Sequence, residues 1–174
     1  MKKLLIGAVM LSIAMAFELI SPDFKGKIHI NQVYPECGGK NISPMLIWKD
    51  APKETKSFAI TMHDPDAPTP HGWWHWIVIN IPKDVHEFPE NAGSPVSEYF
   101  DLGFQTINDY GEIGYGGPCP PPGAPHRYII TLYALDVAGF KTKRDVSPLR
   151  VVKAIESHTI AKTSVMGIYA RGWR

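Results

Sequence analysis

Two histidines each follow a proline-rich loop, and each begins a segment with the composition of a β-strand. His75 begins HWIVINIP, and His126 begins HRYIITLYALDV. Asp64 ends a third such segment, SFAITMHD, just before the first of the two loops. Imidazole and carboxylate groups can bind an anion, ligate a metal ion or transfer a proton. The chemistry open to this chain therefore depends on whether its fold brings these three side chains together.

The segments 57–64 and 75–82 are predicted to form an antiparallel hairpin. That pairing would bring Asp64 and His75 to the same end of a sheet. The loop between them contains prolines, which fix φ and stiffen it. We expect the Asp64 carboxylate either to orient His75 or to accept a hydrogen bond from a protonated ligand oxygen or an ammonium group. A carboxylate beside an imidazole would raise the pKa of the ring and favour the charged form that binds anions.

The second loop, GYGGPCPPPGAP at 114–125, combines glycines with prolines. Glycines let a ligand approach the main chain, whose N–H groups suit phosphate oxygens. In the strand that follows, His126 and Tyr128 share one face and Arg127 points the other way. We therefore assign His126 and Tyr128 to a ligand. Arg127 is assigned to the scaffold, where we expect it to pair with Asp66.

The remaining sequence predicts one domain of short strands that position these loops. The chain has 174 residues, is 44% hydrophobic, and spreads 16 prolines and 15 glycines along its length, which is typical of many turns. Further strands are predicted at 27–34 and 165–172, so the fold class is mainly β, a sandwich or a barrel. One helix is predicted over 148–162, with Ser147 as its cap and Pro148 at its first position.

The N-terminus has the pattern of a secretory signal peptide. Lys2 and Lys3 precede an apolar run of 13 residues, 4–16, which ends in Ala-Met-Ala. The run is shorter than the roughly 20 residues that span a bilayer, and no later apolar run approaches that length. We expect cleavage near Ala16, export to the periplasm or the extracellular space, and a mature domain of residues 17–174.

Export and charge limit the partners of the mature domain. Removing residues 1–16 takes away two lysines, so 16 basic residues and 17 acidic ones remain and the formal charge changes from +1 to −1. Neither this balance nor the distribution of basic residues favours nucleic acid or an anionic membrane as a partner. In an oxidising compartment Cys37 and Cys119 can form a disulfide, with two separate buried thiols as the alternative.

The motifs together resemble the phosphatidylethanolamine-binding protein family, most closely its bacterial and archaeal branch. The resemblance extends over residues 17–174. The segments that carry it are DPDAP (64–68), HWIVIN (75–80), GYGGPCPPPG (114–123) and HRY (126–128), with FELISPDF and CGGKNISPMLIW nearer the N-terminus.

The resemblance implies a Greek-key β-sandwich with a C-terminal helix and few short helices. It also implies a small pocket at one end for a phosphate-like anion or a phospholipid head group, and neither a cofactor nor a metal. Carried over motif by motif, the ligand-binding residues are Asp64, Pro68, His75, Gly117, Pro118, His126 and Tyr128. Eukaryotic relatives are associated with inhibition of kinases or proteases, so a protein partner of this kind is an extrapolation from the family.

Two classes of function follow from the same residues. The first is a non-catalytic binding protein whose Asp/His/His pocket holds a small anion. The second is a hydrolase or a metal-dependent enzyme that uses these groups as acid, base or ligands. The sequence has no Gly-x-Ser-x-Gly nucleophile motif and no His-x-His or Glu-x-x-His pair. We therefore favour the binding protein, which has no catalytic residues.

Overall fold

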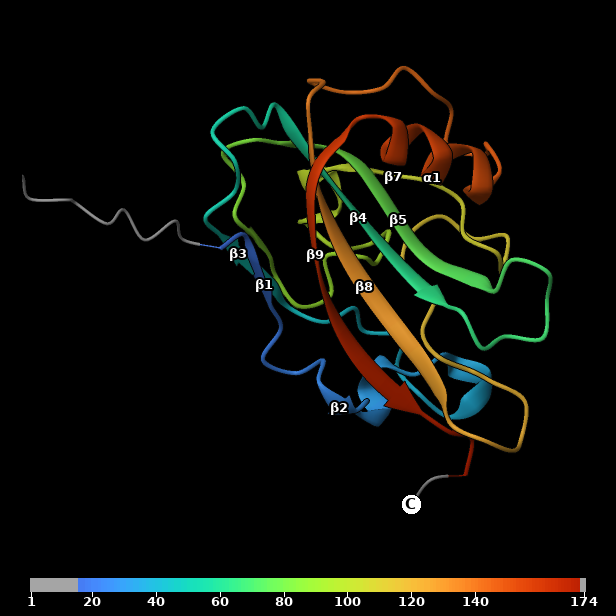
Figure 1. The fold of residues 1–174 in the computed structure, drawn as a ribbon. Coiled ribbons are helices and arrows are strands. Elements are labelled where there is room, and N and C mark those ends of the chain that lie inside the picture. Colours follow the sequence, from blue (N-terminus) through green and yellow to red (C-terminus); the bar gives the residue numbers. More distant parts are fainter. Residues whose placement is uncertain (1–15, 173–174) are drawn as a thin grey trace, which may run out of the picture.

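The computed structural model describes residues 16–172, which form two β-sheets and one α-helix (Figure 1). The predicted signal segment therefore lies, apart from Ala16, outside the described residues. The larger sheet has six strands in the order β2-β9-β8-β4-β5-β7. In that order the strands are Gly26–Lys27, Thr159–Tyr169, His126–Leu135, Ser57–Asp64, Trp73–Pro82 and Phe104–Gln105. The smaller sheet consists of β1 (Glu18–Ile20), β3 (Leu46–Lys49) and β6 (Glu87–Phe88), with β3 in the middle.

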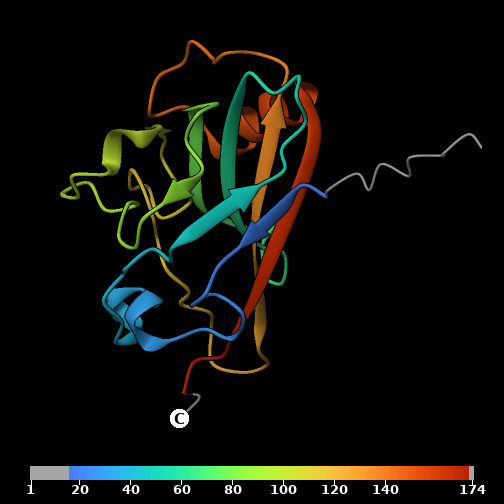
Figure 2. The same cartoon turned by 90° about the vertical axis from the view of Figure 1, so that its left-hand side faces the viewer.

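The main hydrophobic core lies between the two sheets. Figure 2 shows β1 and β3 crossing the long strands of the larger sheet as a second layer. Trp48 of β3 packs edge-on against Phe58 of β4, with ring centroids 5.6 Å apart, and both side chains are fully buried. Both layers around this core are β-sheets, so the fold class is mainly β, as predicted.

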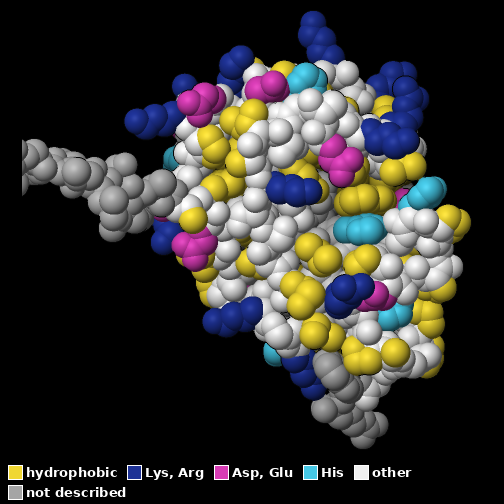
Figure 3. Space-filling view, viewed as in Figure 1, with side chains coloured by type: hydrophobic (Ala, Val, Ile, Leu, Met, Phe, Trp, Pro, Cys, Tyr) yellow, Lys and Arg dark blue, Asp and Glu magenta, His cyan; other side chains and the backbone are white. Residues whose placement is uncertain are grey.

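The helix α1 (Pro148–Ser157) covers the opposite face of the larger sheet. Its buried residues Val151, Val152 and Ile155 pack against a second core that includes Ile77 and Tyr133. Where α1 covers them, the central strands are thus buried on both faces, which explains the nearly continuous apolar sequences there. Below α1 the outer face of this sheet is open, and its hydrophobic side chains are interspersed with charged ones (Figure 3).

The predicted helix is too long. It begins at Pro148 as expected, although the Ser147 side chain makes no capping hydrogen bond, and it ends at Ser157. The Thr159 hydroxyl donates to the Ile155 carbonyl at the helix end, and the chain then enters β9. The β-branched residues after the helix favour a strand. The last strand consequently starts at Thr159 and not at 165.

The predicted strand at 27–34 is also wrong for most of its length. Only Lys27 belongs to a strand, and Ile30–Gln32 form the short 3₁₀ helix η1. His29 Nδ1 accepts from the Asn31 N–H at 3.2 Å, and this local bond competes with an extended chain. Two more 3₁₀ turns, η2 (Pro35–Cys37) and η3 (Phe100–Leu102), interrupt the loops.

The predicted hairpin forms and is extended by a third strand. β4 pairs antiparallel with β5 on one side and with β8 on the other. Asp64 ends β4, while Trp73 begins β5 and His126 begins β8. Because both pairings are antiparallel, the end of β4 lies between the beginnings of β5 and β8. Within residues 16–172, no helix is long and apolar enough to cross a membrane.

Candidate functional site

A cavity of about 250 Å³ opens at this end of the larger sheet, between the two proline-rich loops. Its walls come mainly from apolar and aromatic side chains, and its polar groups come from the ends of β4, β5 and β8. The lining residues are Asp64, Ala67, Pro68, Thr69, Trp73, His75, Tyr110, Cys119, Pro120, Pro121, His126 and Tyr128. Five of the seven residues predicted to bind a ligand thus surround one cavity.

The Asp64 carboxylate is paired with His126. Asp64 Oδ2 lies 2.7 Å from His126 Nδ1, and the two side chains are 4% and 12% exposed. The other oxygen, Oδ1, accepts from the Asp66 backbone N–H at 2.8 Å. This pairing orients the His126 ring and presents its Nε2 atom as the remaining polar group. The expectation that Asp64 orients His75 is therefore wrong.

His75 is held instead by the glycine-rich loop. Its Nδ1 lies 2.7 Å from the Gly116 carbonyl oxygen, so Nδ1 carries the proton and donates. The ring is 2% exposed, and burial lowers its pKa to about 4, an effect larger than the opposing charge of Asp64. The expected increase in pKa is therefore wrong for this histidine. His75 is neutral at pH 7, and its Nε2 is a hydrogen-bond acceptor.

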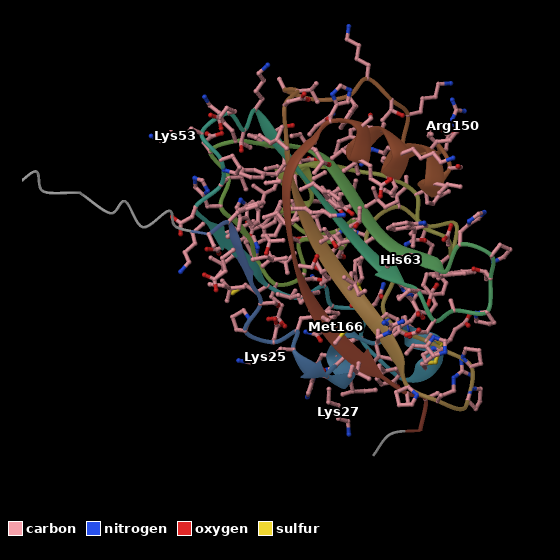
Figure 4. The ribbon with its side chains drawn as sticks, viewed as in Figure 1. Lys25, Lys27, Lys53, His63, Arg150 and Met166 are labelled. Carbon is pink, nitrogen blue, oxygen red and sulfur yellow. A yellow bond between two sulfur atoms is a disulfide. The ribbon has the colours of Figure 1, made fainter. Side chains whose placement is uncertain are left out.

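A β-bulge separates His75 from Asp64. In the β4–β5 register Met62 is opposite Trp76 and His63 is opposite Trp74, so His75 has no partner on β4. An extra residue of this kind changes the direction of the side chain. His63, labelled in Figure 4, lies on the other face of β4; its ring stacks on Trp74 with ring centroids 4.0 Å apart, and it does not line the cavity.

Tyr128 places a buried hydroxyl in the cavity. The side chain is fully buried, and its OH makes no hydrogen bond of standard geometry with any of residues 16–172. Burial, followed by the charge of nearby Asp64, raises the pKa of Tyr128 well above its usual range. The hydroxyl therefore keeps its proton and can donate it in a hydrogen bond. The edge of this ring also packs against His75, with centroids 5.2 Å apart.

The backbone of the glycine-rich loop serves the scaffold and not the cavity. The Gly116 N–H donates to the His75 carbonyl at 2.8 Å, and the Gly117 N–H donates to Asn41 Oδ1 at 2.7 Å. Gly117 and Pro118 are buried and do not line the cavity, contrary to the role carried over to them. A Cβ on Gly117 would lie 2.1 Å from the Gln32 carbonyl oxygen, so close backbone packing is the reason for glycine here. The expected amide donors are therefore already occupied.

Two contacts fix the walls, the predicted Arg127–Asp66 pair and a disulfide that the sequence left as one of two alternatives. Arg127 donates from Nε and an Nη nitrogen to the two carboxylate oxygens of Asp66, at 2.9 and 2.7 Å, and this ion pair lowers the pKa of Asp66 to about 2. Cys37 and Cys119 form a disulfide, with Cα atoms 5.5 Å apart. The first contact ties the DPDAP loop to β8. The second ties η2 to the proline-rich loop.

Sequence reasoning missed several wall residues. Tyr110 stacks on Tyr34 with centroids 4.2 Å apart and donates its OH to the Gly117 carbonyl at 3.0 Å. It lies in an irregular segment without a motif, so no sequence signal pointed to it. Trp73 begins β5 at the cavity edge, where its position depends on how the strands pair.

Comparisons with known proteins identify a family and several relatives of this chain. The family model described as phosphatidylethanolamine-binding protein matches residues 21–170. The Escherichia coli K12 protein YbhB (UPF0098) is 40% identical over 157 residues, covering 88% of this chain and 99% of YbhB. YbcL of the same organism is 37% identical over 180 residues, covering 97% and 98% of the two chains.

Two solved structures have the same fold. The crystal structure of E. coli YbcL, described as a new member of the mammalian PEBP family, has a TM-score of 0.85 and 36% identity, covering 88% of this chain and 98% of YbcL. The Chlamydia trachomatis homologue CT736 has a TM-score of 0.75 and 36% identity, covering 88% of this chain and 97% of its own.

Proposed function

The chain belongs to the phosphatidylethanolamine-binding protein family, and from this premise we propose that its cavity binds a small phosphate or phosphomonoester without transforming it. One observation carries the proposal. Within residues 16–172 the buried Tyr128 hydroxyl makes no hydrogen bond of standard geometry; its polar neighbour is the Asp64 carboxylate, and it lies in a cavity that His126 also lines. Buried polar groups normally have partners, so a ligand oxygen is the natural acceptor for this hydroxyl.

The hydrogen-bond donors and acceptors of the cavity determine which protonation state of a ligand fits best. The Tyr128 hydroxyl donates, His126 Nε2 donates when the ring is charged, and neutral His75 accepts through Nε2, with the Asp64 carboxylate as a second acceptor. A fully deprotonated anion would satisfy the donors but meet two acceptors. A phosphomonoester has a second pKa near 6, so near this pH part of it also carries a proton that an acceptor can bind. The site is therefore suited to a partly protonated oxyanion.

The lining residues favour binding over catalysis. Among the residues that line the cavity, Thr69 provides the only aliphatic hydroxyl, and it donates to the Gly72 carbonyl. The sulfur of Cys119 is in a disulfide, so it is not a free nucleophile. The neutral His75 has a pKa of about 4, which makes it a weak base at pH 7. These features support a binding protein and give the hydrolase alternative no nucleophile.

We also propose that the mature protein is exported. The charged N-terminus, the apolar run and the small residues at 14 and 16 support cleavage near Ala16. The Cys37–Cys119 disulfide is consistent with an oxidising compartment. Mass spectrometry of the protein from cell fractions tests this: a mature chain beginning near Phe17 outside the cytoplasm is expected, and a full-length cytoplasmic chain would contradict it.

Titration calorimetry with inorganic phosphate and with phosphoethanolamine, at pH 6 and pH 8, tests the binding proposal. We expect weak binding that is at least threefold tighter at pH 6, because lower pH favours the imidazolium form of histidine and the protonated ligand. His126→Ala should abolish the binding.

His158→Ala is the matched control, because His158 forms a similar pair with Asp136, Nδ1 to Oδ1 at 2.9 Å, on the surface away from the cavity. Absence of binding at both pH values contradicts the proposal. So does equal binding by the wild type and His126→Ala.

A further inference from the structure

The cavity wall between Pro118 and His126 has few attachments to the rest of the protein. Four prolines in this stretch have no N–H group to donate. Within the described part of the chain, the backbone of residues 119–125 takes part in no hydrogen bond. The last backbone anchor before it is the Pro118 carbonyl, which accepts from the Tyr34 N–H at 3.1 Å, and the next is the start of β8.

The disulfide is the covalent anchor of this wall. Cys119 is bonded to Cys37 in η2, and Arg171 donates from an Nη nitrogen to Cys119 Sγ at 3.2 Å. Pro120 and Pro121, which follow directly, line the cavity. Figure 4 shows the sulfur atoms at the end of the molecule opposite Arg150. The position of the two prolines therefore depends on a bond that can be opened chemically.

The two sulfur atoms of the bond are not equivalent. Cys119 Sγ has the Arg171 guanidinium beside it at 3.2 Å, whereas Cys37 lies in η2, whose charged residue is the acidic Glu36. A neighbouring positive charge stabilises a thiolate, and the sulfur that is the more stable thiolate leaves faster in exchange. Both cysteines are half-buried, so a small thiol can reach the bond.

We propose that the Cys37–Cys119 disulfide is a thiol–disulfide exchange site at which a dithiol reductant opens the cavity wall. One thiolate of the reductant attacks Cys37 Sγ. A bond forms between these two sulfurs, the Cys37–Cys119 bond breaks, and its electron pair leaves on Cys119 as a thiolate beside Arg171. The second thiolate of the reductant then attacks the reductant sulfur of the mixed disulfide, closes the reductant's own disulfide and releases Cys37. The protein gains two electrons, which the dithiol loses.

Opening the bond releases the wall and changes the cavity. In the described part of the chain, residues 119–125 lose the one covalent cross-link between Pro118 and β8, so Pro120 and Pro121 no longer have a fixed position over the polar groups. Ligand affinity then falls on reduction, and this consequence alone rests on the proposed function. The direction of exchange and the opening of the wall do not depend on any ligand.

Trapping the first step tests the direction of exchange on the folded, oxidised full chain, so it does not require the reduced protein to fold. The protein is treated briefly with glutathione, quenched with N-ethylmaleimide and analysed by mass spectrometry. We expect glutathione on Cys37 and maleimide on Cys119. Arg171→Gln should lose this preference and react about threefold more slowly. Arg150→Gln is the control, because it removes an equal charge from an exposed position on α1. Glutathione mainly on Cys119, or the same preference in Arg171→Gln, overturns the proposal.

Acrylamide quenching tests the opening of the wall without a ligand. The contribution of Trp73, obtained by difference from Trp73→Phe, should be quenched more strongly after reduction with dithiothreitol. Equal quenching in both redox states overturns control of the cavity by the disulfide. Calorimetry with phosphate on the oxidised and the reduced protein tests the effect on the ligand. We expect at least tenfold weaker binding by the reduced protein, and equal binding by both forms would also contradict an effect of the disulfide on the cavity. Absence of binding by the oxidised protein contradicts the proposed function, while the trapping and quenching results still decide the exchange proposal.

Discussion

Replacing Tyr128 by phenylalanine should separate ligand affinity from stability. The hydroxyl is buried but makes no hydrogen bond of standard geometry in the described part of the chain, so its removal breaks no such bond there. We expect the free energy of unfolding of Tyr128→Phe, measured with urea at pH 7, to stay within about 0.5 kcal/mol of wild type or to rise, because loss of a made hydrogen bond is what destabilises such variants. A bond from the hydroxyl to a charged ligand is worth about 1.5 kcal/mol, so phosphate affinity at pH 6 should fall about tenfold.

Tyr115→Phe is the matched control for that experiment. Tyr115 is also buried, but its OH donates to the Gln32 carbonyl at 2.9 Å, away from the cavity lining. This variant should lose about 1–2 kcal/mol of stability and keep its phosphate affinity. The assignment of Tyr128 to the ligand is refuted if Tyr128→Phe loses as much stability as the control, or if its affinity is unchanged.

Three further predictions follow from the same contacts. The pKa of His75 is lowered to about 4, so the unfolded chain takes up this proton near pH 6.5 and the folded chain only near pH 4. The free energy of unfolding should therefore fall by about 3 kcal/mol more in wild type than in His75→Asn between pH 7 and pH 4 in urea titrations, and equal losses would contradict the burial argument. Arg127→Met should raise the pKa of Asp66 from about 2 towards its ordinary value in a carbon-13 NMR titration while costing less than about 1 kcal/mol, because the pair is exposed; an unchanged pKa would be inconsistent with the ion pair. Replacing both Cys37 and Cys119 by alanine should cost about 4 kcal/mol in urea unfolding, since the bond closes a loop of 82 residues, and a loss below about 1 kcal/mol would argue against this stabilising role.

Local pattern was enough to predict the parts of the site that depend on neighbouring residues. The hairpin formed by 57–64 and 75–82, the outward direction of Arg127 and its contact with Asp66 follow from alternation and turn chemistry, and all three are present. The bulge beside His75 could not be predicted, because it depends on how two strands fit against the rest of the core.

The partner of Asp64 depends on strand order. Sequence places Asp64 near His75, its neighbour along the chain, whereas the sheet places β8 on the other side of β4 and brings in His126. The glycine amides were misjudged for a similar reason. Their acceptors are the His75 carbonyl and Asn41, which lie far away in sequence and become neighbours only in the folded chain.

The central claim is that a phosphate group is held by the imidazoles of this cavity. Long-range ¹H–¹⁵N NMR of the histidine side chains during a titration with inorganic phosphate at pH 6 tests it most directly. We predict that the Nε2 resonances of His126 and His75 shift and saturate together, while those of His158 on the surface do not move. The account would be contradicted if phosphate left the Nε2 resonances of both cavity histidines unchanged, or if it shifted those of all three histidines to the same extent.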